Sequence, residues 1–185
     1  MSTCYIACKY CSGEIGSAQA MTILKETGQG IVEACHPECK PVRMKCLSVR
    51  QPWVDAIFRL GKNVENRSWR TNYRGPLLIH ARKNLDCEAC SRFNSLAGRA
   101  PSEEFVTGAI IGIVDLTDVM ADSERKWADA DSWNWLLANA RLLAKPIPCA
   151  GKTGIFEVEI PLRAVQEARA SEGEIPCQPV PGVGA

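Results

Sequence analysis

The sequence lacks the features of a membrane or secreted protein. No apolar run among its 185 residues approaches the roughly 20 residues that a membrane-spanning helix requires. Residues 1–11 carry no basic start followed by an apolar stretch, so we expect no secretory signal. Neither sign of charge dominates, since the formal net charge is +1. We therefore expect a soluble, cytoplasmic protein that does not act at a membrane.

The near-neutral total charge hides an uneven distribution along the chain. Residues 44–100 contain eleven basic and four acidic residues, a net charge of +7. Residues 101–185 contain seven basic and thirteen acidic residues, a net charge of −6. Because a local basic patch attracts phosphate groups, the middle of the chain is the predicted place for a phosphate-bearing partner.

The chain divides into three parts: a cysteine-rich segment 1–43, a main domain 44–162, and a short helix with a Pro/Gly-rich flexible tail, 163–185. β-Branched runs and turn residues predict strands over 45–49, 64–69, 76–83, 108–119, 142–147 and 154–160. Apolar spacing predicts helices over 52–60, 86–96 and 162–170. The tryptophan-rich stretch 123–139 is predicted to be a loop or short helix. This pattern favours an α+β fold, a small β-barrel with flanking helices.

The cysteine-rich segment has the spacing of a zinc site. Cys8 and Cys11 are separated by two residues, as are His36 and Cys39, and two such pairs suit one tetrahedral ion. We predict a knuckle-like or treble-clef-like unit around a structural Zn²⁺, with a hairpin between the pairs. Four protein ligands leave no open position for catalysis. Cys35 is an alternative to His36 as a ligand.

Polar and aromatic residues gather in the basic middle of the chain. Lys62, Arg67 and Arg74 offer donors for phosphate, and Trp69 offers a flat face for a base. Glu65 and Asn66 are candidates for reading a base edge, and His80 and Lys83 are predicted to lie beside them. The alternative for Glu65 and Arg67 is an ion pair that holds the strand. These eight residues form the predicted binding site.

Three stretches in this region, 47–53, 61–69 and 73–83, together with 151–157, closely resemble the ASCH domain of the PUA-like superfamily. The resemblance covers about residues 44–160. It implies a β-barrel whose cleft beside the first helix takes nucleic acid, RNA more than DNA, or a nucleotide.

Some members of that family hydrolyse acylated cytidine with a lysine, a threonine nucleophile and a glutamate. Lys62 matches the lysine, but Asn63-Val64-Glu65 carries no hydroxyl where the nucleophile is expected. The sequence therefore favours a binding module. The alternatives are an amidohydrolase in which Glu65 is the base and Lys62 the oxyanion partner, and an adaptor whose zinc segment docks a protein.

Overall fold

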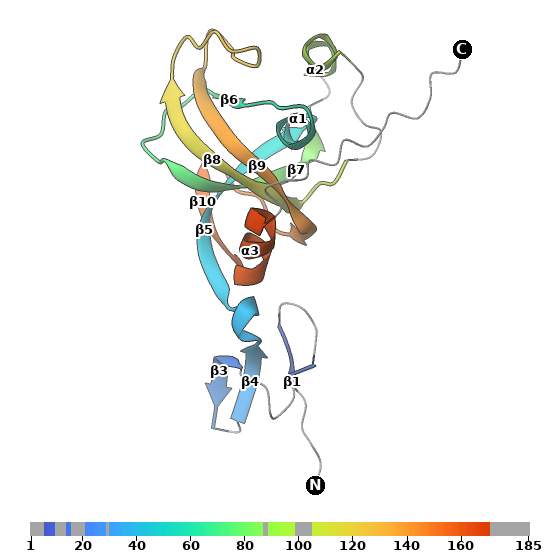
Figure 1. Ribbon diagram of the computed structural model, residues 1–185, viewed down its shortest axis with the longest axis vertical. Coiled ribbons are helices and arrows are strands. Elements are labelled where there is room, and N and C mark those ends of the chain that lie inside the picture. The colour runs from blue at the N-terminus through green and yellow to red at the C-terminus, as the bar shows by residue number, and fades with distance from the viewer. Residues whose placement is uncertain are drawn as a thin grey trace, which may run out of the picture.

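The computed structural model describes residues 6–9, 14–15, 21–28, 30–86, 89–98 and 105–170, and its centre is a curved six-stranded sheet (Figure 1). The strands follow the order β10-β5-β7-β8-β9-β6. Their bounds are Pro41–Gln51 for β5, Val64–Arg67 for β6, Gly75–Leu85 for β7, Ala109–Met120 for β8, Trp133–Pro148 for β9 and Ile155–Pro161 for β10. β5 and β7 pair in parallel and all other neighbours are antiparallel, so the sheet is mixed.

The sheet separates two hydrophobic clusters, and β7 contributes to both. Leu77, Ile79 and Ala81 are buried in one cluster, while Leu78 is buried in the other. Successive residues of a strand face opposite sides of the sheet, which explains why neighbouring residues of β7 enter different clusters. His80 lies on the Leu78 side and is also buried.

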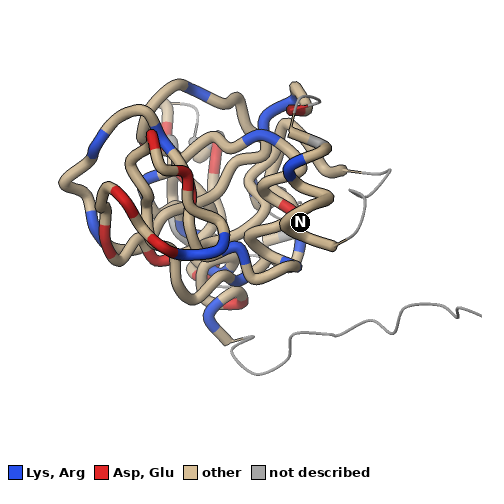
Figure 2. Tube along the Cα trace, turned by 90° about the horizontal axis from the view of Figure 1, so that it is seen from above, with Lys and Arg blue, Asp and Glu red and all other residues tan. Residues whose placement is uncertain are grey.

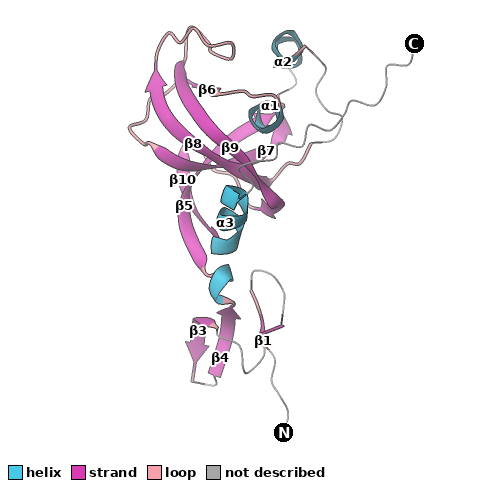
Figure 3. Cartoon of the chain, in the orientation of Figure 1, coloured by secondary structure: helices cyan, strands magenta, loops and turns pink. Residues whose placement is uncertain are grey.

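Three α-helices accompany the sheet (Figure 3). The first, α1, spans Trp53–Arg59, and Gly61 follows it with a φ of 66°, a left-handed conformation that glycine adopts without strain. α2 spans Cys90–Ala97 and begins later than the sequence predicted. α3 spans Leu162–Ala170, as predicted, and packs against the second cluster. No helix in the described ranges is long and apolar enough to cross a membrane.

The N-terminal segment consists of short strands: β1 (Ile6–Ala7), β2 (Glu14–Ile15), β3 (Thr22–Thr27) and β4 (Gly30–Cys35), followed by the 3-10 helix η1 (Pro37–Cys39). β3 and β4 form the predicted hairpin. β5 continues directly from η1, and the Leu162 N–H at the start of α3 donates to the Lys40 carbonyl over 2.9 Å. The segment is therefore joined to the sheet by a continuous strand and by α3 (Figure 1).

Two expectations differ from the structure. Within the described residues the sheet does not close into a barrel, because β10 and β6 lie at opposite edges and do not pair. The second half of the tryptophan-rich stretch is part of β9 rather than a loop or helix. Trp135 is fully buried and its ring meets Trp69 edge-on, with 4.6 Å between centroids. Such packing against a residue distant in sequence overrides the local pattern.

Candidate functional site

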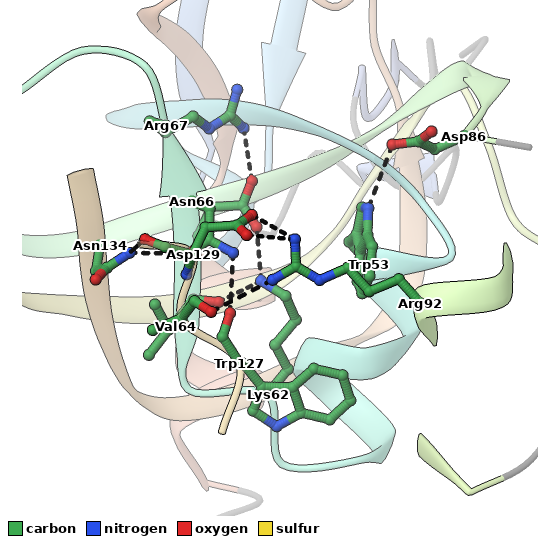
Figure 4. A network of polar contacts seen from close by, with 12 residues as sticks. Trp53, Lys62, Val64, Asn66, Arg67, Asp86, Arg92, Trp127, Asp129 and Asn134 are labelled. Carbon is green, nitrogen blue, oxygen red and sulfur yellow. Dashed lines mark hydrogen bonds and ion pairs between the residues drawn. The ribbon is translucent and has the colours of Figure 1, made fainter. Parts of the chain in front are cut away.

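An open cleft of about 440 Å³ lies where α1, β6 and α2 meet. The Gly61 turn after α1 leads straight into Lys62, and β6 then presents Glu65, Asn66 and Arg67. We call this hollow the first cleft (Figure 4). Its lining residues are Ser48, Arg50, Trp53, Lys62, Glu65, Asn66, Arg67, Arg82, Asp86, Ala89, Arg92, Leu96, Trp127 and Asp129. Four of the eight predicted binding residues therefore meet here.

Glu65 is held between two cations. Its Oε2 lies 2.9 Å from Lys62 Nζ and its Oε1 lies 3.1 Å from an Arg67 guanidinium nitrogen. Lys62 also donates to the Val64 carbonyl, and Arg67 Nη2 donates to the Ser48 carbonyl over 2.7 Å. The ion pair that the sequence left as an alternative for Glu65 and Arg67 is thus present. Within the described part of the chain, the buried Nε–H of Arg67 has no acceptor.

The charge of Glu65 follows from this arrangement. Burial by itself raises the pKa of a carboxyl group, but the positive charges of Lys62 and Arg67 outweigh it and hold the pKa of Glu65 below its usual value. Glu65 is therefore an anion at neutral pH. A carboxylate with a lowered pKa is a weaker base, so this pairing does not prepare Glu65 to accept a proton.

Asn66 holds the loop after β8, which contributes Trp127 and Asp129 to the lining of the first cleft (Figure 4). Its Nδ2 donates to the Trp127 carbonyl over 2.9 Å, and its Oδ1 accepts from the backbone N–H of Asp129 and from Asn134 Nδ2. Arg92 of α2 reaches the same loop, with 2.6 Å between its Nη1 and Asp129 Oδ2. Most of the hydrogen-bonding capacity of Asn66 therefore serves the protein itself.

Trp53 closes the base of the first cleft. Its Nε1–H donates to Asp86 Oδ2 over 3.3 Å, and Lys62 Nζ lies 5.7 Å from its ring centroid. The tryptophan packs against Phe93 of α2 as well, so it is partly core, as its helical spacing suggested. Trp127, from the loop after β8, also contributes to the lining, but it is almost fully buried.

A second cleft of about 550 Å³ adjoins the first and shares Arg50 and Arg82 with it. His80 and Lys83 lie here. The remaining lining residues of the second cleft are Asn84, Gly108, Cys149, Ala150 and Gly151. The structure therefore places His80 and Lys83 beside the first cleft but not within it.

His80 joins three segments of the fold. The Cys149 carbonyl can only accept, so His80 Nε2, 3.0 Å away, carries the proton and Nδ1 accepts from the Ser48 hydroxyl over 3.2 Å. The pKa of His80 is lowered, mainly by burial. The hydrogen bond to the Cys149 carbonyl acts in the opposite direction, and the nearby positive charge of Arg82 lowers the pKa further. Gly151 packs over this pair, since a Cβ there would lie 2.5 Å from His80 Cε1.

Two predicted binding residues lie outside both clefts. Trp69 packs against Trp135, whose Nε1–H donates to the Trp69 carbonyl over 3.3 Å. Arg74 pairs with Asp118 over 2.8 Å. Sequence reasoning missed other lining residues, because their proximity depends on pairing between distant segments. The lining residues missed in this way are Arg50, Arg82, Asp86, Arg92, Trp127 and Asp129.

In the N-terminal segment, Cys8, His36 and Cys39 come together, with their ligand atoms all within 4.8 Å of one another. The parallel bridge between Cys8 and Ala34 brings the first cysteine to the end of β4, and η1 returns Cys39 to the same point. Cys35 is buried in β4 and is not part of this group, so the geometry favours His36. Cys11 lies outside the described residues. Two thiolates and an imidazole suit Zn²⁺.

The fold and the first cleft define an α+β domain with an open, polar cleft beside its first helix. Residues 47–147 match the ASCH domain, and the chain belongs to this family. The resemblance noted from the sequence is confirmed.

Two curated relatives share this region. The chain is 34% identical over 88 residues to activating signal cointegrator 1 of Homo sapiens, covering 44% of this chain and 15% of that protein. It is 33% identical over 128 residues to activating signal cointegrator 1 of Mus musculus, covering 62% of this chain and 22% of that protein. The chain therefore spans less than a quarter of the length of either relative.

Proposed function

We propose that the chain binds nucleic acid, RNA in preference to DNA, through the first cleft. The observation that carries this proposal is the lining itself, which combines five cationic side chains with the partly exposed Trp53. Arginines that contact phosphates and aromatic rings that stack on bases are the shared means of single-strand binding.

Membership of the ASCH family supports the same proposal. The name of the two relatives describes a cointegrator of activating signals, and the alignments cover only a small part of each relative. We therefore make the proposal for this chain alone. We propose that it consists of three parts, residues 1–43, 44–162 and 163–185, and that it is located in the cytoplasm. Docking of a protein partner by the N-terminal segment is the alternative role for that part.

Binding can be tested with the full chain and a labelled single-stranded RNA in fluorescence anisotropy at low salt. Ultraviolet cross-linking followed by mass spectrometry would then locate the contact. We expect cross-links on the peptides that carry Trp53, Asn66 or Trp127, which line the first cleft. Absence of measurable binding to RNA and DNA, or cross-links confined to other surfaces, would contradict the proposal.

We also propose that Cys8, His36 and Cys39 hold a structural Zn²⁺, with Cys11 as the fourth ligand. The donor set fits this ion, and an N-terminal segment of about 40 residues has too little core to fold without help. The ion would tie the β3–β4 hairpin to the residues that lead into β5. It would take no part in chemistry at the first cleft.

The contact between Lys62 and Glu65 is the observation that favours the alternative, hydrolysis of an acylated cytidine. Two features of the first cleft weigh against it. The pKa of Glu65 is lowered, and Ser48, the one described lining residue with a hydroxyl group, is buried. We therefore propose binding without turnover. Sustained release of acyl groups from acylated cytidine by the unmodified protein would overturn this choice.

A further inference from the structure

The fold neutralises most of the basic charge in residues 44–100. Six cations of this region form ion pairs with carboxylates: Lys45, Arg59, Lys62, Arg67, Arg74 and Arg92. Arg70 instead lies over the ring of Trp133, 5.4 Å from its centroid. Figure 2 shows the resulting mixture of basic and acidic residues along the trace. Lys62, Arg67 and Arg74, which the sequence predicted as phosphate contacts, are therefore each paired with a carboxylate.

Besides Arg70, three cations of the same region have no carboxylate partner within the described part of the chain: Arg50, Arg82 and Lys83. All three line the second cleft, and none of the described residues that line it is acidic. Arg50 and Arg82 also reach the first cleft, where the Glu65 and Asp129 carboxylates are already paired with cations and the Asp86 carboxylate accepts from Trp53 Nε1–H. The uncompensated positive charge is thus concentrated in the second cleft and at the junction of the two.

A bulge between β5 and β7 explains this concentration. The register moves from Val49 opposite Ala81 to Gln51 opposite Leu85, so the single residue Arg50 faces three residues of β7. In a regular strand, successive side chains point to opposite faces. A bulge interrupts that alternation and redirects side chains, which lets the consecutive residues Arg82 and Lys83 line the same cleft.

We propose that the second cleft is a phosphate-binding subsite for a single-stranded nucleic acid whose base occupies the first cleft. This inference rests on the proposed function and deepens it. Arg50 and Arg82 hold the phosphate at the junction, and Lys83 holds the next one along the strand. The ligand is accordingly an oligonucleotide of at least two units, and each cleft lies within the range of about 300–1,000 Å³ that is usual for ligand sites.

The test compares Arg50→Ala and Arg82→Ala with the unmodified full chain, using single-stranded RNA of about eight nucleotides, a length typical of such sites. Each variant should lower affinity roughly tenfold, as expected for loss of a charged hydrogen bond. The slope of log affinity against log salt should fall by about 0.7 for each lost phosphate contact. Arg82→Lys keeps the charge and should retain the slope of the unmodified chain.

Arg43→Ala is the matched control, because it removes one positive charge from an exposed pair with Glu159, remote from both clefts. It should leave the salt slope unchanged. We expect both variants to fold, because neither Arg50 nor Arg82 is paired with a carboxylate that the substitution would leave without a partner. Thermal melting measures this.

The outcomes separate the two proposals. If the unmodified chain binds RNA while Arg50→Ala and Arg82→Ala keep its affinity and slope, the phosphate subsite is wrong and the binding function stands. Tighter binding of a duplex than of the single strand would also refute the subsite. If the unmodified chain binds no nucleic acid, the proposed function fails and the subsite fails with it.

Discussion

The charge triad of Lys62, Glu65 and Arg67 allows a quantitative prediction for Glu65→Gln. This substitution keeps the shape of the side chain and removes its negative charge. Lys62 is only 3% exposed, so its ammonium would remain buried beside a neutral amide, and Arg67 would lose the same partner. Removal of one member of a buried ion pair costs about 3–5 kcal/mol, because the remaining charge is desolvated without compensation.

Urea denaturation followed by circular dichroism measures this loss. With a denaturant slope of about 2 kcal/mol per molar, we expect the midpoint of Glu65→Gln to fall by more than about 1 M. The matched control is Glu157→Gln, which breaks a pair with Lys45 at a similar distance, 2.8 Å, where both side chains are about half exposed. Screening by water should make that change small. Equal effects of the two substitutions would refute our reasoning about burial.

The pH dependence of the same triad has a definite sign. Because the pKa of Glu65 is lowered in the folded state, its pairing contributes full stability above the ordinary glutamate pKa of about 4.3. That contribution should disappear as the pH falls further, through the folded-state pKa. Comparison of the wild type with Glu65→Gln from neutral to acidic pH would reveal it. Parallel stability curves in this window would contradict the lowered pKa.

Three further predictions concern other parts of the chain. Gly151→Ala should destabilise the fold by about 1–3 kcal/mol through overpacking, because its Cβ would lie 2.5 Å from His80 Cε1; thermal melting measures this. The wild type should lose stability as the pH falls below about 6.5, since the unfolded chain protonates His80 before the folded chain does, and denaturation of His80→Asn should lack this component. Protein purified without added metal should contain about one zinc per chain, and Cys39→Ser should lose it by elemental analysis.

The first and third of these predictions have a control within the chain. Gly28→Ala adds a Cβ that meets nothing within 4 Å and should melt close to the wild type. Cys149→Ser alters a cysteine outside the metal group and should retain the ion. A folded N-terminal segment in metal-free protein would contradict the zinc proposal, and an unchanged melting temperature for Gly151→Ala would show that His80 moves aside easily.

Local patterns in the sequence were sufficient for the family and for many of the elements. The alternation of Leu77, Leu78 and Ile79 predicted a strand with two apolar faces, because side-chain direction depends only on strand geometry. The hairpin of β3 and β4 and the helix Leu162–Ala170 followed equally from local spacing. Four of the lining residues lie close together in the sequence: Lys62, Glu65, Asn66 and Arg67. Their sharing of one cleft could therefore also be predicted from the sequence.

Only the tertiary structure decided which charges remain available to a ligand. Arg74 was predicted from the sequence to contact phosphate, yet Asp118, 44 residues away, neutralises it. Asp129, 37 residues away, neutralises Arg92 in the same way. Arg50 and Arg82 look ordinary in the sequence, but a bulge between parallel strands leaves them unpaired at the junction of two clefts. Ion pairing depends on distance in space and on burial, and the strand register that sets both is a property of the folded sheet.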